Sequence, residues 1–255
     1  RVYLAKEKST NFVCVLKSMC KAFVDSPQKV QLIAREVEIN SNLNHENVVK
    51  MYGYFADEKR FYIILEYANG GDLYSYMLSQ HGRKFSESVA SNFVRQLIKA
   101  VQYIHSKGVM HRDIKPENIL LSDGMLKLSD FGWSVKHVDS KFRKTHCGTL
   151  DYTPPEMLHR ALGHGQNKYT FAVDLWAIGV FAYEMNTGQA PFGNHPPKVT
   201  HQKISQVSFN FPQYFSHDLK DFLVKTLRKD PEHRMQINDM LNHPWIKKYE
   251  TVPTQ

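Results

Sequence analysis

Hydrophobic and polar residues form short strand-like runs over the first 68 positions, interrupted by one stretch with helical spacing. Residues 1–10 and 11–19 are rich in β-branched and aromatic residues and are separated by a polar turn, which predicts a β-hairpin. Residues 29–43 carry apolar positions about one helical turn apart, which predicts a helix. Residues 48–57 and 60–68 then predict two further strands.

Helical spacing dominates the rest of the chain, which begins with a glycine-containing break at residues 69–73. One helix face is marked by apolar residues three or four positions apart: Val89, Phe93, Leu97, Val101 and Ile104. Gly108 is expected to end that helix, and residues 175–185, apolar on nearly every side, predict a buried central helix. We therefore expect an α+β fold with a small sheet-rich lobe, residues 1–68, and a larger helical lobe, residues 69–255.

Composition and charge narrow the classes of function. Of the 255 residues, 42% are hydrophobic and 23% are charged, which is ordinary for a folded protein and excludes a disordered chain. Lys and Arg exceed Asp and Glu by 33 − 25 = 8. That excess fits either polyanion binding or a solvated basic surface. We favour the second because the chain has no run of five like charges, and we expect no direct nucleic-acid binding.

Targeting and redox signals are sparse. The longest apolar run, residues 175–183, is too short to cross a bilayer, so no membrane partner is expected. The three cysteines, Cys14, Cys20 and Cys147, are odd in number and lack metal-ligand spacing, which indicates reduced thiols in the cytosol or nucleus. The chain opens on sequence typical of mid-strand, so we expect the native protein to begin earlier.

The stretch HRDIKPEN, residues 111–118, carries reactive side chains that a turn does not require. Asp113, Lys115 and Asn118 are followed by Asp130, which opens the sequence Asp-Phe-Gly. Carboxylate and amide oxygens are the ligands that Mg²⁺ prefers, so Asn118 and Asp130 are candidate metal ligands. Phosphoryl transfer also needs a carboxylate that orients the attacking hydroxyl and a cation for developing charge, which fits Asp113 and Lys115.

The alternative reading of these residues is a pair of Asp-capped turns. Seven specified positions at fixed spacing arise by chance on the order of once in a billion windows, at roughly one in twenty per position. We therefore favour a phosphoryl-transfer site that uses ATP and Mg²⁺.

With these motifs the whole chain resembles the eukaryotic protein kinase family, which implies the bilobal protein-kinase fold. The strand CVLK resembles the family's Val-Ala-Ile-Lys strand, which makes Lys17 the lysine that holds the α- and β-phosphates. Its usual partner is a glutamate on the following helix. Glu36 fits that role, and Glu38 is the alternative on a different helix face.

The resemblance also implies a complete nucleotide site. Glu66, Tyr67 and Ala68 resemble the hinge that binds adenine through its backbone, with Leu65 as gatekeeper and Asp72 facing the ribose. The full set of expected nucleotide-site residues is Val2, Val15, Lys17, Leu65, Glu66, Tyr67, Ala68, Asp72, Glu117, Asn118, Leu120, Ser129 and Asp130.

Structural and regulatory positions follow from the same resemblance. Glu156 is expected to pair with Arg234, and Asp174 to tie the central helix to the catalytic loop. The expected regulatory residues are Thr145, Arg112, Trp133 and Cys147. Thr145 is the expected activating phosphosite, because it lies in the activation segment after basic residues and its phosphate could pair with Arg112.

The segments DFGWSV and CGTLDYTPPEM resemble the Aurora family of mitotic Ser/Thr kinases in particular, and a Trp directly after Asp-Phe-Gly is a rare choice. The resemblance implies protein substrates with an upstream Arg, histone tails among them. It also implies residence in the nucleus and cytoplasm and at the spindle, centrosome or chromosomes. Glu117, Asp72 and Glu184 are candidates for binding substrate arginines, and the alternative is that they are solvated surface acids.

Some positions depart from the family pattern. Residues 158–172 form a longer segment than usual, expected as a surface loop, and Val15 replaces the usual Ala above the adenine. The family's Gly-rich phosphate loop is absent from the sequence, which by resemblance opens on the loop's trailing residues Arg-Val-Tyr, so we expect that loop to lie before Arg1 in the native protein. Asn40 is polar where most kinases are apolar, facing Met51 and Phe131, so we expect a weakly held active arrangement and an activator peptide on the small lobe.

Two functions from different classes fit this sequence. The first is an active Ser/Thr protein kinase, and the second is a kinase-shaped scaffold that binds partners through its basic surface without catalysis. We favour the kinase because a scaffold has no chemical need for the complete set of Lys17, Glu36, Asp113, Asn118 and Asp130.

Overall fold

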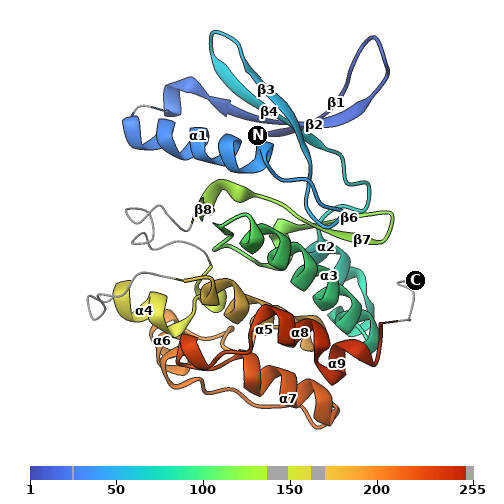
Figure 1. Cartoon of the computed structure of the whole chain (residues 1–255), viewed down its shortest axis with the longest axis vertical. Coiled ribbons are helices and arrows are strands. Elements are labelled where there is room, and N and C mark those ends of the chain that lie inside the picture. Colours follow the sequence, from blue (N-terminus) through green and yellow to red (C-terminus); the bar gives the residue numbers. More distant parts are fainter. Residues whose placement is uncertain (25, 137–148, 162–169, 251–255) are drawn as a thin grey trace.

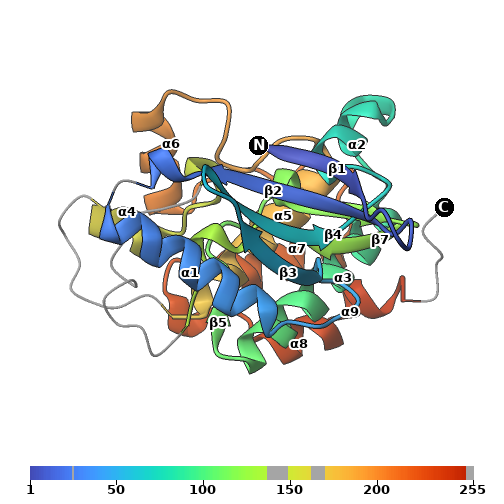
Figure 2. The same cartoon turned by 90° about the horizontal axis from the view of Figure 1, so that it is seen from above.

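A twisted antiparallel sheet with one long helix beside it forms the upper part of the molecule in Figure 1. The computed structural model describes residues 1–24, 26–136, 149–161 and 170–250. The sheet has the strand order β1-β2-β4-β3. Its elements are β1 (Val2–Lys6), β2 (Val13–Cys20), α1 (Pro27–Ser41), β3 (Met51–Ala56) and β4 (Arg60–Glu66). From above, α1 runs along the side of the sheet next to β3 (Figure 2).

The lower part of the molecule is mostly helical, and short strand pairs lie between it and the sheet (Figure 1). The short strands are β5 (Val109–Met110), β6 (Ile119–Ser122), β7 (Met125–Leu128) and β8 (Val135–Lys136). The α-helices are α2 (Leu73–Ser79), α3 (Glu87–Ser106), α4 (Pro155–Ala161), α5 (Ala172–Thr187), α6 (Pro197–Gln206), α7 (His217–Thr226), α8 (Ile237–Asn242) and α9 (Pro244–Lys247). This architecture confirms the predicted bilobal α+β fold.

Strand register explains how the small sheet lines a cleft. The predicted hairpin pairs Val2 with Lys17, and the next pairing sets Val15 against Leu65. Because alternate residues of a strand face the same side, these four side chains share the face that lines the cleft between the lobes. The alternation of side chains along these strands therefore determines which residues line the cleft.

Two helices predicted from apolar spacing form the centre of the lower lobe. The apolar stripe of α3 is buried, and the helix ends before Gly108, which adopts the left-handed φ of +73°. Helix α5 is buried on nearly every side, as its continuous apolar sequence predicts. No helix within the described ranges is both long and apolar enough to cross a membrane.

One expectation is wrong in part. Residues 158–172 were expected as a surface loop, but α4 continues through Ala161 and Leu158 is only 1% exposed. Leu158 packs into the hydrophobic core, so the first part of the segment, through Ala161, belongs to the helix and not to a surface loop. Residues 162–169 of that segment lie outside the described residues, as do Thr145 and Cys147.

Close packing of α5 on α7 gives a direct test of the fold. A Cβ added at Gly179 would lie 2.7 Å from Thr226 Oγ1 and 2.9 Å from Leu227 Cδ2. Gly179→Ala should therefore lower the free energy of unfolding by about 1–3 kcal/mol, as overpacking does. The measurement is urea denaturation. The control is Gly53→Ala, whose Cβ would lie 4.0 Å from Ile64 Cδ1, an ordinary van der Waals contact, and should leave the stability unchanged. Equal stability of both variants would show that α5 and α7 do not approach this closely.

Candidate active site

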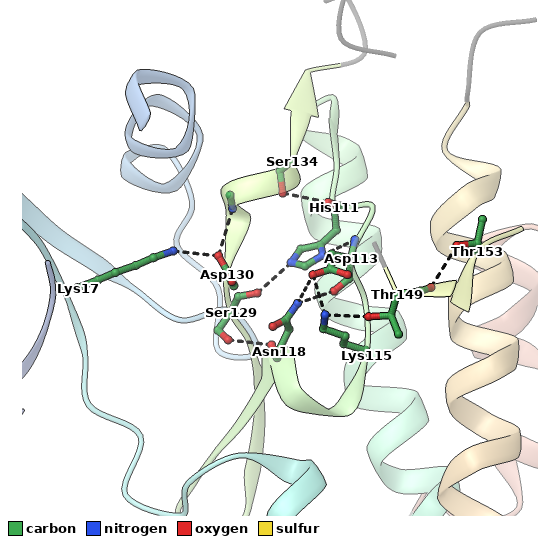
Figure 3. Close-up of polar contacts among 11 residues, drawn as sticks. Lys17, His111, Asp113, Lys115, Asn118, Ser129, Asp130, Ser134, Thr149 and Thr153 are labelled. Carbon is green, nitrogen blue, oxygen red and sulfur yellow. Dashed lines mark hydrogen bonds and ion pairs between the residues drawn. The ribbon is translucent and has the colours of Figure 1, made fainter. Parts of the chain in front are cut away.

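Lys17 on β2 joins three elements that are distant in sequence. Its Nζ lies 2.6 Å from Glu36 Oε1 on α1. It also lies 2.9 Å from Asp130 Oδ1, which follows β7 (Figure 3). Burial alone would lower the pKa of Lys17, but the two carboxylates outweigh it and raise that pKa. The alternative partner, Glu38, instead pairs with Lys136 at 2.5 Å.

The loop between β5 and β6 is held from below by one buried carboxylate. Asp174 at the start of α5 accepts hydrogen bonds from the backbone N–H groups of His111 and Arg112, both at 2.9 Å. His105 Nε2 donates to the same carboxylate at 2.8 Å. Burial would raise the pKa of Asp174, but these donors outweigh burial and lower it, so the loop rests on a charged anchor.

Asp113, Lys115 and Asn118 point toward one another in this loop (Figure 3). Asn118 Nδ2 donates to Asp113 Oδ2 at 2.7 Å and to the Asp113 carbonyl at 2.8 Å. Lys115 Nζ lies 3.2 Å from Asp113 Oδ2 and donates to Thr149 Oγ1 at 2.9 Å. Asp113 Oδ1 is buried and has no hydrogen-bond partner within the described residues. Among the described residues, the carboxylate is thus fixed through Oδ2 alone.

A cleft of about 310 Å³ lies between the lobes, which is within the usual size range for a small-molecule site. All the expected nucleotide-site residues line it except Asp72, whose Oδ1 caps α2 by accepting from the Ser75 N–H at 2.7 Å. The lining residues are Val2, Val15, Lys17, Glu36, Asn40, Val49, Leu65, Glu66, Tyr67, Ala68, Glu117, Asn118, Leu120, Ser129, Asp130 and Phe131.

The segment at the back of the cleft is tied to both lobes by contacts that sequence reasoning did not identify. Glu66 Oε1 lies 2.7 Å from the buried Lys127 on β7, and Glu66 Oε2 accepts from the Lys50 N–H at 3.0 Å. Val49, which lines the cleft, and Thr149, which holds Lys115, were also missed. A lone Lys or Thr carries no sequence signal for such a contact.

The expected pair of Glu156 with Arg234 forms beside the central helix, and Arg112 makes a contact that was not expected. Arg234 makes a bidentate pair with Glu156, with both distances 2.7 Å, and its guanidinium stacks on Trp176. Arg112 donates from Nε and Nη2 to the carbonyl of Trp133, at 2.8 and 2.6 Å. The two Arg112 hydrogen bonds link the loop that carries Asp113 to the segment after Asp130.

Glu184 on α5 is buried, so its interpretation as a solvated surface acid is wrong. Tyr152 donates a hydrogen bond to it. Burial, together with the nearby carboxylates of Glu117 and Asp151, raises the pKa of Glu184 to about 7, against the lowering effect of the Tyr152 hydrogen bond. The apolar pattern of α5 predicted burial of the helix but gave no sign that this acid turns inward.

The oxygen ligands around Asp130 suit Mg²⁺ better than they suit a metal ion whose ligands all come from protein side chains. Asp130 presents its carboxylate, and Asn118 keeps its side-chain carbonyl oxygen because its amide nitrogen is engaged by Asp113. Within the part of the chain that the structure describes, no three His, Cys, Asp or Glu residues converge on a metal position. Mg²⁺ suits such a site because it takes one or two protein ligands and completes its shell with phosphates and water.

Comparison with known proteins agrees with this geometry. The family model described as protein kinase domain matches residues 1–246. The chain is 45% identical over 252 residues to an Aurora kinase of Schizosaccharomyces pombe, covering 98% of this chain and 68% of that protein. It is 44% identical over 253 residues to Aurora kinase A-B of Xenopus laevis, covering 99% of the chain and 60% of the relative.

A mammalian relative is covered more fully. The chain is 42% identical over 250 residues to Aurora kinase C of Mus musculus, covering 98% of the chain and 87% of the relative. The chain thus spans between three fifths and nine tenths of the length of these relatives. It belongs to the Aurora family of serine/threonine protein kinases.

Proposed function

We propose that this chain transfers the γ-phosphoryl group of ATP to Ser or Thr hydroxyls of protein substrates, with residues 1–68 and 69–255 as the two lobes of one catalytic unit. The observation that carries the proposal is the convergence of Lys17, Glu36 and Asp130 on one side of a cleft that Asn118 also lines. Asp113 contacts Asn118, and its Oδ1 has no hydrogen-bond partner within the described residues. A binding scaffold would not need this set of charges.

Each residue has a role that follows from its contacts. Asp113 Oδ1 accepts the hydrogen bond of the substrate hydroxyl and orients it, and Lys115 offsets charge near the transferred group. Lys17, fixed by Glu36, binds the α- and β-phosphates. Asn118 and Asp130 would hold Mg²⁺, which would supply positive charge to offset that of the phosphates.

The adenine site is formed by apolar walls and backbone groups. Val15 and Leu120 lie in the lining of the cleft and form the two faces that enclose the ring. The segment Glu66 to Ala68 supplies backbone donors and acceptors, with Leu65 at its start. The side chain of Glu66 is already engaged by Lys127, so the hinge is held in place before nucleotide binds.

Transfer of labelled phosphate from ATP to an Arg-containing Ser peptide tests this function. Asp113→Asn and Asp130→Asn should each lower kcat by several decades, because both groups act on charge in the transition state. Both variants should stay folded, because neighbouring elements support the two loops. Thermal unfolding of each variant checks this. The control is Asp123→Asn on the exposed turn between β6 and β7, which should keep the wild-type rate.

The kinase-shaped scaffold is the competing outcome of that assay. It would be favoured if the wild-type chain incorporated no label above the Asp113→Asn background. The role given to either aspartate would be wrong if its variant kept more than about a tenth of the wild-type kcat.

We further propose that the preferred substrates carry an Arg upstream of the acceptor, as in histone tails and other mitotic, spindle or chromosomal proteins. The support is an acidic region in which Glu117 and Asp151 act on the buried Glu184. Asp72, which caps α2, is the third candidate acid. With such substrates, we expect the protein to act in the nucleus and cytoplasm, and at the spindle, centrosome or chromosomes.

The raised pKa of Glu184 predicts a pH-dependent preference for Arg. Since Glu184 is neutral below its pKa of about 7 and charged above it, the KM for an Arg peptide should fall as pH rises through about 7. The drop should be about tenfold, the scale of one charge-assisted hydrogen bond. The measurement is KM from pH 6 to 8.5 for the Arg peptide and a matched Gln peptide, in wild type and Glu184→Gln. An identical pH profile for both peptides in wild type would rule out this role for Glu184.

We propose that Thr145 is the activating phosphosite and that Arg112 receives its phosphate. Thr145 and the basic residues before it lie outside the described residues, so the support is the position of Arg112. Its guanidinium reaches the carbonyl of Trp133 at the start of the same segment. A phosphate there adds about −1.5 to −2 charges and can order a segment through Arg.

An activator peptide on the small lobe is supported by a groove between α1 and the sheet. The groove has a volume of about 530 Å³. It is lined by residues that include Val24, Val30, Ile33, Val37, Tyr54 and Phe61. Val30 and Tyr54 are 53% and 59% exposed, so a peptide with apolar or aromatic side chains would cover them.

Asn40 is a feature of α1 through which such a peptide could change the position of the helix. It is 4% exposed, and its Oδ1 has no partner within the described residues. A buried polar atom without a partner costs stability, so α1 is held less firmly than it could be. A ligand that prefers the active position of α1 would then shift the population toward it.

Replacing Asn40 should relieve this defect. Asn40→Leu should raise the basal kcat/KM by about threefold to tenfold, in line with removing one orphaned polar group, and weaken the response to an activator peptide. The measurement is peptide phosphorylation with and without activator. Gln28→Leu, an exposed site on the same helix, is the matched control and should leave both rates unchanged. An unchanged basal rate in Asn40→Leu would contradict the link between Asn40 and activation.

A further inference from the structure

The residues at the start of α1 form a modification motif that the proposed function does not use. Ser26 is followed by Pro27, Gln28 and Lys29, a Ser-Pro-X-Lys sequence. Proline directly after the acceptor and a basic residue two positions later is the pattern that proline-directed protein kinases accept. The sequence has one other Ser/Thr-Pro pair, Thr153-Pro154.

The structure makes Ser26 accessible and Thr153 inaccessible. Ser26 is partly exposed, with extended backbone at φ −136° and ψ 148°, and the four residues after it are exposed. An extended acceptor is the conformation that a kinase active site binds, so only the first turn of α1 must open. Thr153 is 3% exposed and donates its hydroxyl to the Thr149 carbonyl.

Within its helical residues, α1 also lacks the charges that stabilise helix ends. Its first turn has no acidic residue and its last turn no basic residue. Lys29 places a positive charge at the end where the helix dipole is already positive. The Ser26 cap is weak, since Oγ accepts from the Lys29 N–H at 3.4 Å. By contrast, α3 carries Glu87 directly after its own serine cap.

We propose that Ser26 is a phosphorylation site for a separate, proline-directed Ser/Thr kinase, and that its phosphate strengthens α1 and so raises the activity of this chain. The γ-phosphoryl group of ATP would pass to Ser26 Oγ, with release of ADP and the hydroxyl proton. The phosphate adds about −1.5 to −2 charges at the N-terminal end of α1, where the helix dipole favours a negative charge. Because α1 carries Glu36, the same charge supports the Glu36 contact with Lys17.

The chain's own proposed specificity does not fit this site. The three residues before Ser26 are Phe23, Val24 and Asp25, with no Arg among them. A second enzyme is therefore required, and the modification can be measured without any activity of this chain. The effect on rate rests on the proposed function.

The first experiment measures the modification alone. The folded Asp113→Asn protein, which removes self-phosphorylation, is incubated with a purified cyclin-dependent kinase and Mg·ATP, and the sites are found by peptide mass spectrometry. We expect phosphate at Ser26, none at Thr153, and none in the same region of Asp113→Asn/Ser26→Ala. Absence of phosphate at Ser26 in the folded protein would overturn the proposal, whatever the activity of the chain.

The second experiment measures the consequence. The wild-type chain phosphorylated at Ser26 should show a kcat/KM about twofold to fivefold above the unmodified chain, the scale of one charge at a helix end. Ser26→Asp should change the rate in the same direction. Ser41→Asp, which puts the same charge at the C-terminal end of α1, should lower it.

The outcomes separate the two proposals. Equal rates for modified and unmodified chains, or equal effects of Ser26→Asp and Ser41→Asp, would overturn the activating role of Ser26. A wild-type chain that labels no peptide, beside clean modification of Ser26, would overturn the proposed function and keep the modification site.

Discussion

The contact of Lys17 with Glu36 and Asp130 is the constraint on which the rest of the site depends. It joins β2, α1 and the segment after β7, so Lys17 is held in this position only when all three elements are in place. Glu36 is 6% exposed, and a buried carboxylate that lost its cation would be left with an uncompensated charge. A displacement of α1 would therefore also disrupt the contacts that line the cleft.

The two sides of that contact differ in how firmly they are held. The loop of Asp113 rests on Asp174, which accepts three hydrogen bonds, and Arg234 fixes Glu156 through two more. Helix α1, in contrast, has a long serine cap, and the buried Asn40 oxygen has no hydrogen-bond partner in the part of the chain that the structure describes. Helix α1 is the less firmly held of the two. A ligand or charge that acts on α1 therefore needs only a small binding free energy to change its position.

Sequence predicted much of this molecule where a pattern or a motif carries the signal. Alternating and helical spacing predicted the hairpin, the strand pair and the helices α3 and α5, and family motifs predicted the residues that line the cleft. The inward turn of Glu184, the pairing of Glu66 with Lys127 and the contact of Lys115 with Thr149 could not be predicted. Each depends on distances between segments far apart in the chain, and a single polar residue carries no sign of its partner.

The most direct test of the account is a double-mutant cycle on Lys17→Met and Glu36→Gln, with kcat/KM for peptide phosphorylation measured by a radiolabel assay sensitive enough for slow variants. If Glu36 acts by positioning Lys17, the double variant should be about as slow as the Lys17 variant alone, because the second change removes a contact that is already lost. If the two losses instead multiplied, the residues would act independently, and the contact between them would not be the constraint that holds the site together.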